Sequence, residues 1–225
     1  MKCTSMKWSA LPVALLMLGS VAMAQEQSSS GSQQPAPAAT PAATPAPAAK
    51  PTVAQRKENQ QDRIAQGVKS GQLTAGETAN LETKEAAING ETKADRAANG
   101  GKLTTAEKAQ INKQQNQVSK QIYTDKHNAN TQHYGNNKVD QRRENQQDRI
   151  AQGIKSGQMT AGEAAKAENQ QKGINQQVRA DRAANGGKLT TGEKAQVNKE
   201  QNAASKNIYK KKHNAKTQPQ AQPKK

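Results

Sequence analysis

Beyond residue 54, apolar residues are few in this chain, and most stand singly among amide and charged side chains. Their spacing is that of helices. Ile111, Val118 and Ile122 recur at i, i+7 and i+11, and Ile64 and Val68 stand at i and i+4. Such spacing places the apolar residues on one face of a helix. The pattern therefore predicts amphipathic helices rather than strands.

The helical pattern occurs twice. Residues 56–132 return at 142–218, 86 positions later: DRIAQGVKSGQLTAGE from Asp62 becomes DRIAQGIKSGQMTAGE from Asp148, and the later block ADRAANGGKLTT is identical in both copies. Self-similarity at a fixed spacing indicates duplicated structural units, and these are longer than single solenoid repeats. One interpretation therefore has to explain both copies.

The motif Gly-x-Leu/Met-Thr-x-x-Glu stands twice in each copy. The threonine side chain accepts a hydrogen bond from the amide three residues on, and the glutamate reaches back to the threonine amide and faces the positive end of the helix dipole. This capping box begins a helix, and the preceding Leu or Met is expected in the core. The structural caps are Thr74, Glu77, Thr104, Glu107, Thr160, Glu163, Thr190 and Glu193.

The caps and the glycines at the breaks divide each copy into three helices, at about 55–69, 75–98 and 105–128 in the first copy. We therefore predict an all-α fold of two tandem three-helix units, built from helix hairpins. The expected order is a signal peptide at 1–24, a disordered Pro/Ala/Ser-rich linker at 25–54, helical repeat 1 at 55–132, a connector at 133–140, helical repeat 2 at 141–218 and a basic disordered tail at 219–225.

The N-terminus has the features of a secretory signal. Lys2 and Lys7 provide the positive charge, residues 8–21 are largely apolar, and a small-residue cleavage pattern ends at Ala24. We expect a cleaved protein that is secreted or periplasmic and has no transmembrane segment. Cleavage would also remove Cys3, the sole cysteine, and with it any disulfide or cysteine metal site.

The predicted core is thin, because the mature chain would contain no Phe or Trp and only three tyrosines. The chain combines low hydrophobicity with a formal net charge of +16. Such a chain buries little apolar surface to compensate for the conformational entropy lost on folding, so we expect marginal stability. Tyr123 and Tyr209 occupy matching positions. We expect their rings to cover the core with the hydroxyls in water, the alternative being that they stack on a base or sugar.

Enzyme chemistry is not indicated. His127 and His213 stand at matching positions near the expected end of the last helix of each copy, where we expect them to be exposed to solvent. His133 has no counterpart in the other copy. No acidic residue stands at metal-ligand spacing from these histidines, and the Asn-Gly-Gly turns lack the Lys-Ser/Thr of a phosphate loop. We therefore predict a non-enzymatic protein with no cofactor and no catalytic residue.

The glycine-to-glutamate segment 71–77 resembles the second half of an EF-hand calcium loop. The first half does not match, since Gln66, Val68 and Ser70 would occupy the first ligand positions. The resemblance implies EF-hand-like hairpins. A longer loop variant leaves weak calcium binding as an alternative, with side-chain ligands at Asp95, Asn99, Glu107, Asp181, Asn185 and Glu193.

The phrases RIAQGVKSGQLTAGE, DRAANGGKLTTAEK and IYTDKHN together resemble a family of secreted bacterial helical-repeat proteins with no assigned activity. The resemblance covers nearly all of both copies. It implies an exported bacterial protein and supplies no activity.

Charge is the feature that suggests a binding function. Residues 56–132 hold twelve Lys and Arg against nine Asp and Glu, whereas residues 142–218 hold sixteen against seven. A basic cluster attracts polyanions, here lipopolysaccharide, cell-surface polysaccharide or nucleic acid. The alternatives are lysines that serve solubility alone and a structural or stress-protective envelope protein. The candidate anion-binding residues are Lys199, Lys206, Lys210, Lys211, Lys212 and Lys216.

Overall fold

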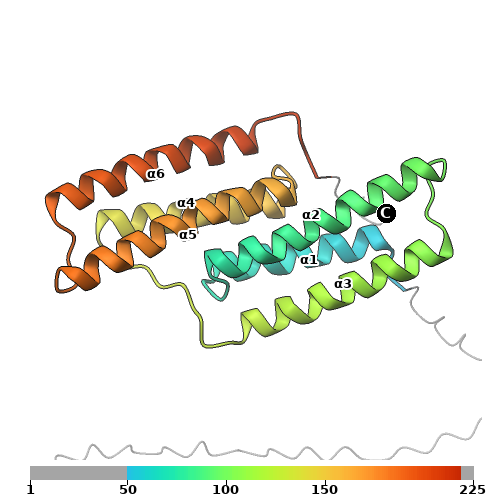
Figure 1. Cartoon of the computed structure of the whole chain (residues 1–225), viewed down its shortest axis with the longest axis horizontal. Helices are drawn as coiled ribbons and strands as arrows, with labels where there is room; N and C mark the ends of the chain where they lie inside the picture. The colour runs from blue at the N-terminus through green and yellow to red at the C-terminus, as the bar shows by residue number, and fades with distance from the viewer. Residues whose placement is uncertain (1–49, 219–225) are drawn as a thin grey trace, which may run out of the picture. The chain divides into compact units, whose positions relative to one another are not determined.

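The computed structural model describes residues 50–218, and within that range the chain forms six α-helices and no strand (Figure 1). The predicted all-α fold of two three-helix units is confirmed. The predicted signal peptide, most of the predicted linker and the predicted tail lie outside the described residues. The helices are α1 (Val53–Lys69), α2 (Ala75–Ala98), α3 (Thr105–Lys126), α4 (Lys138–Lys155), α5 (Ala161–Ala184) and α6 (Thr191–Lys212).

Two predicted boundaries were wrong, because the first helix of each repeat begins earlier than expected. α1 begins inside the predicted linker: the Thr52 side chain accepts from the Gln55 amide at 3.2 Å, and the Gln55 side chain accepts from the Thr52 amide at 2.9 Å. α4 begins inside the predicted connector, where Asn137 accepts from the Asp140 amide at 3.2 Å. α1 thus begins at a Thr-x-x-Gln box and α4 at an asparagine cap, and neither start has the Thr-x-x-Glu motif that marks the other four helices.

The other four helices each begin at a capping box made by a Thr-Glu pair. At the start of α2, the Thr74 amide donates to Glu77 Oε2 at 2.9 Å, and the Glu77 amide donates to Thr74 Oγ1 at 3.3 Å. The residues before the caps are buried, with Leu73 1% and Met159 0% exposed. Asn128 Nδ2 also donates to Glu77 Oε1 at 2.8 Å, so the cap of α2 holds the end of the first repeat as well.

The two repeats share one core. α3 packs on α1 and α2, α6 packs on α4 and α5, and the repeats meet where α2 packs on α5 and α1 on α4. Figure 1 shows α3 and α6 on opposite sides of the four central helices. Residues of both repeats, among them Ile64, Leu81, Ile111 and Ile150, belong to one continuous apolar cluster. A second, smaller cluster, which includes Val178 and Val197, lies within the second repeat. Sharing the larger cluster between the repeats compensates for the lack of aromatic residues in the core.

Buried glutamines fasten the first helix of each repeat to the third. Gln60 Nε2 donates to the carbonyl of Gln115 at 2.6 Å, and Gln115 Nε2 donates to the carbonyl of Val53 at 2.9 Å. Gln146 and Gln201 repeat this arrangement in the second repeat. The bonded Nε2 groups avoid the cost of unpaired buried donors, whereas the Oε1 atoms of Gln60, Gln115 and Gln201 have no partner in the described part of the chain. The amide-rich composition is therefore part of the packing.

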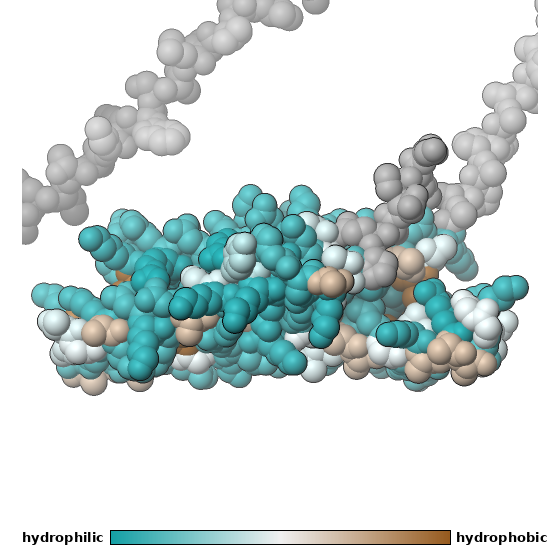
Figure 2. Space-filling view, turned by 90° about the horizontal axis from the view of Figure 1, so that it is seen from above, coloured by the Kyte–Doolittle hydropathy of each residue, from teal (hydrophilic) through white to brown (hydrophobic). Residues whose placement is uncertain are grey.

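The outside of the helical unit is polar. Figure 2 shows hydrophilic side chains over most of the face in view, with apolar residues in small scattered groups. Within residues 50–218, none of the helices combines the length and apolar character needed to cross a bilayer.

Candidate functional site: the basic face of helix α6

The buried stripe of α6 fixes which of its side chains face water. The helix repeats every 3.6 residues, so Lys199, Lys206 and Lys210 fall on the side opposite the stripe, and all three are exposed. Together with the exposed Tyr209, these three lysines form the surface that we call the α6 basic face. The stripe packed against α4 and α5 consists of Val197, Gln201, Ala204 and Ile208.

The other three lysines predicted to bind anions lie elsewhere. Lys211 and Lys212 are half-buried at the flanks of α6, and Lys212 Nζ donates to Gln152 Oε1 at 2.8 Å. Lys216 lies beyond the end of the helix, in the wall of a cavity between the repeats. The structure thus brings three of the six predicted lysines onto one face.

The prediction that the tyrosine rings cover the core was wrong. Tyr123 is 62% exposed and Tyr209 58% exposed. Each ring stacks on the histidine four residues later: the centroids are 4.2 Å apart for Tyr123 and His127, and 4.1 Å apart for Tyr209 and His213. Residues four apart meet on one side of a helix, and here that side faces water because the neighbouring isoleucines already fill the core. The exposed rings leave a flat surface on which another planar group can stack.

Both histidines lie at the exposed ends of their helices. Nδ1 of His213 lies 2.8 Å from the Tyr209 carbonyl oxygen, and Nδ1 of His127 lies 2.7 Å from that of Tyr123. His133 is also exposed, and its Nε2 lies 2.7 Å from Thr131 Oγ1. The contacts of His127 and His213 close the last turns of α3 and α6, whereas His133 bonds within the segment that follows α3.

The matching face of α3 carries less charge. Lys113 and Lys120 occupy the positions of Lys199 and Lys206, but Thr124 stands where the second repeat has Lys210. The excess charge of the second repeat is therefore concentrated near the C-terminal end of α6. A cation there is favourable because the helix dipole is negative at that end.

The residues of the calcium alternative form part of the helix caps. Asn99 Nδ2 donates to Glu107 Oε1 at 2.7 Å and to the Asp95 carbonyl at 2.9 Å, while Glu107 Oε2 accepts from the Thr104 amide at 2.8 Å. The second repeat has the same contacts among Asp181, Asn185, Thr190 and Glu193. In the described part of the chain, no three His, Cys, Asp or Glu residues are grouped so as to hold a metal ion.

Three buried glutamates, two on α2 and one on α5, were missed by the sequence analysis. Glu82, Glu85 and Glu168 are all 0% exposed. Gln61 Nε2 donates to Glu82 Oε2 at 3.2 Å, and Gln147 Nε2 donates to Glu168 Oε2 at 2.9 Å. The sequence does indicate the burial of Glu85, because Leu81, Glu85 and Ile88 are spaced i, i+4, i+7 and so share one helix face.

Burial disfavours the charged form of these glutamates. It raises the pKa of Glu168 to about 8 and that of Glu85 to about 7. Burial also raises the pKa of Glu82 well above its usual range, and repulsion from Glu85 and Glu168 adds to the effect. These buried side chains therefore hold protons at neutral pH, and the stability of the helical unit depends on pH.

A charge network in the second repeat was also missed. Asp140 Oδ1 accepts from Arg143 Nη1 at 2.7 Å, and Asp140 Oδ2 accepts from Arg182 Nη2 at 2.8 Å. Arg143 also donates from Nε to Asn175 Oδ1 at 2.7 Å, and its guanidinium lies 5.1 Å from the centroid of the Tyr134 ring. The hydrogen bonds of Asp140 to Arg182 and Asn137 and the charges of both arginines outweigh burial and lower its pKa. The network ties the start of α4 to α5.

No protein-family model, curated protein or solved structure matches this chain. The resemblance to secreted bacterial helical-repeat proteins and to EF-hand hairpins therefore stays a prediction.

Proposed function

We propose that this protein is a non-enzymatic binder of phosphate-bearing polymers and that the α6 basic face is its contact surface. The observation that carries the proposal is that Lys199, Lys206 and Lys210 stand exposed on one side of α6. Lysines that neutralise phosphates release the counterions of the polymer, and this release drives binding. The signal-like N-terminus supports a site of action in the periplasm or outside the cell.

The exposed Tyr209 ring favours a nucleic acid among such polymers. A ring flanked by lysines can stack on an unpaired base while the lysines follow the phosphates. Lipopolysaccharide and polyphosphate offer phosphates but no base. Cell-surface polysaccharide with carboxylates alone would bind through charge only.

The test compares two triple variants of the full chain that have the same net charge. One carries Lys199→Gln, Lys206→Gln and Lys210→Gln on α6. The control changes three exposed lysines of α3 to glutamine, at positions 108, 113 and 120. Glutamine is a comparable helix former, so both variants should keep their helicity.

Binding to a fluorescent oligothymidine of about 20 nucleotides is measured by anisotropy at low salt. We expect the α6 variant to bind at least about tenfold more weakly than the wild type, and the α3 control to lose much less. Equal losses would show that general charge, not this face, attracts the polymer. No binding by the wild type would leave the lysines with a role in solubility alone.

A single variant, Tyr209→Ala, separates stacking from charge. Loss of stacking on one base should weaken oligothymidine binding about fivefold or more. Binding to polyphosphate and to lipopolysaccharide should not change, because neither presents a base. Equal weakening for all three polymers would contradict the stacking role.

A further inference from the structure

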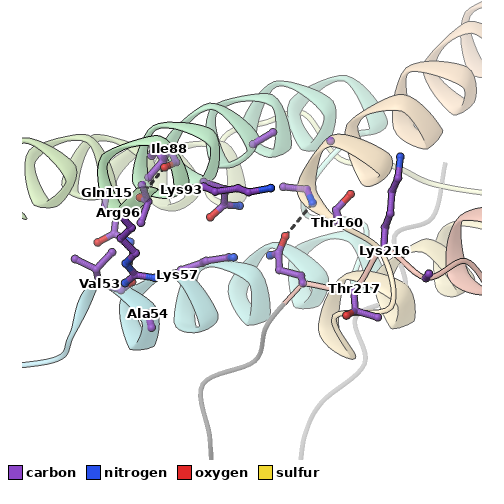
Figure 3. A pocket seen from close by; sticks show the side chains of 17 residues that line it. Val53, Ala54, Lys57, Ile88, Lys93, Arg96, Gln115, Thr160, Lys216 and Thr217 are labelled. Atoms are coloured by element: carbon purple, nitrogen blue, oxygen red, sulfur yellow. Dashed lines mark hydrogen bonds between the residues drawn. The ribbon is translucent and has the colours of Figure 1, made fainter. Parts of the chain in front are cut away.

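A basic cavity of about 840 Å³ lies between the first repeat and the start of α5. One wall comes from α1 and α2, and the other from Thr160–Gly162 and the segment 215–218. Figure 3 shows Lys57 and Lys93 extending into the space between these walls, with Lys216 on the far side. The lining includes four cations, Lys57, Lys93, Arg96 and Lys216, and no acidic residue.

The repeat period relates this cavity to the charge network of the second repeat. Lys57 corresponds to Arg143, and Arg96 corresponds to Arg182. In the second repeat, the Asp140 carboxylate joins both arginines. In the first repeat, Ala54 stands in the place of Asp140, so the chain supplies no carboxylate at that point.

The side chains that are hydrogen-bonded around Asp140 in the second repeat have counterparts without such bonds in the first repeat. Asn175 accepts from Arg143 and donates to Gln132 Oε1 at 3.1 Å. Its counterpart Asn89 lines the cavity, and the side chains of Asn89, Lys57 and Arg96 make no hydrogen bond or ion pair with any residue in the range 50–218. The first repeat therefore has the cations of this arrangement but lacks the carboxylate that Asp140 supplies in the second repeat.

The surroundings of the cavity do not neutralise these cations. Glu85 and Glu82 attract Lys57 electrostatically, but neither comes within ion-pair distance of it. Burial outweighs this attraction and lowers the pKa of Lys57. Gln218 Oε1 accepts the amide hydrogen of Ala161 at 2.9 Å and closes one side.

We propose that this cavity binds a small organic anion with two or more negative charges, carried as carboxylates or phosphates. One anionic group lies between Lys57 and Arg96, where the second repeat has its own aspartate. The remaining charge faces Lys93 and Lys216. A cavity of this volume is in the range of small-molecule sites, and Val53 and Ile88 offer apolar contacts for the body of the ligand.

The proposal is tested by isothermal titration of the full chain with citrate and, separately, with pyrophosphate. The decisive variant is Ala54→Asp, which gives the first repeat the built-in carboxylate of the second. Ala54 is exposed in the first turn of α1, where an aspartate favours the helix, so the variant should fold. Ala54→Asn is the matched control, because it has nearly the same shape and no charge.

We expect one ligand per chain for at least one of the two anions, and binding about tenfold or more weaker in Ala54→Asp, since like charges would then face each other. Ala54→Asn should bind nearly as the wild type does. Citrate binding alone would identify a carboxylate ligand, and pyrophosphate binding alone a phosphate ligand. No binding of either anion at millimolar concentration, or equal weakening in both variants, would overturn the proposal. The α6 triple variant should bind as the wild type does, so this outcome is independent of the polymer site.

Discussion

Replacing Glu168 by glutamine should remove part of the pH dependence of this protein's stability. The side chain lies on α5, is 0% exposed and accepts a hydrogen bond from Gln147 of α4, and burial raises its pKa from 4.5 to about 8. Between these two values, the unfolded chain has released a proton that the folded protein still holds. Raising the pH therefore favours the unfolded state, and the free energy of unfolding falls between about pH 4.5 and about pH 8.

The magnitude follows from the size of the rise in pKa. Each pKa unit is worth about 1.4 kcal/mol, so Glu168 alone contributes a loss of about 5 kcal/mol across this interval as an upper value. Glutamine cannot ionise, and its carbonyl oxygen can keep the hydrogen bond from Gln147. The cost of burying its amide hydrogens is the same at every pH, because glutamine does not titrate. The informative quantity is therefore the change with pH, not the stability at one pH.

The assay is urea unfolding followed by far-ultraviolet circular dichroism at several pH values between 4.5 and 8. The wild type should lose stability toward pH 8 more steeply than Glu168→Gln. The free energy of unfolding of the variant minus that of the wild type should therefore increase with pH. Glu144→Gln, which removes an exposed glutamate on α4, is the control and should follow the wild type. Parallel pH profiles for Glu168→Gln and the wild type would refute the reasoning.

Four further substitutions, one of them a control, test the caps, the buried network and the hairpin of the first repeat. Thr104→Ala should cost about 0.5–2 kcal/mol, seen as a lower melting temperature, because the Glu107 amide loses its acceptor. Asp140→Asn should cost about 3–5 kcal/mol in urea unfolding, because a guanidinium with only 7% of its side chain exposed loses its charged partner; an unchanged midpoint would contradict the network. Gly71→Ala should destabilise by about 1 kcal/mol or more, since the backbone φ is +71° and a Cβ would lie 2.5 Å from the Gln132 carbonyl oxygen. Gly90→Ala, in α2 with nothing near its Cβ position, should instead stabilise by about 0.5–1 kcal/mol, and equal effects of the two glycine changes would contradict the account.

The helices were predictable because their signals are local. A Thr-x-x-Glu box acts within one turn, so its position alone marks the starts of α2, α3, α5 and α6. The i, i+7, i+11 spacing likewise identified Ile111, Val118 and Ile122, which are 0%, 3% and 0% exposed. Duplication gave each signal twice.

The packing between repeats was not predictable, because no local pattern states which face of α2 meets α5. For the same reason the burial of Glu82 and Glu168 was not predicted, since a glutamate is usually exposed unless a second element covers it. Tyr123 and Tyr209 were misplaced for a related reason: a ring is more often buried, and only the filled core shows why these stand in water.

The candidate site was predictable only in part. Composition located the excess charge in the second repeat, but the helix phase relative to the core selects which lysines share a face. The difference between Ala54 and Asp140 was visible on aligning the repeats. The consequence of this difference could be seen only in the structure, where Arg143 of α4 and Arg182 of α5 both bind the Asp140 carboxylate.

The salt dependence of polymer binding tests the proposed function most directly. For a single-stranded nucleic acid, the logarithm of the association constant falls with the logarithm of salt concentration by about 0.7 per phosphate neutralised. If Lys199, Lys206 and Lys210 each neutralise one phosphate of an oligothymidine, changing all three to glutamine should reduce that slope by about 2. The control with three lysines of α3 changed should keep nearly the full slope. Equal slopes for the α6 variant and the wild type would contradict the α6 basic face as the polymer site.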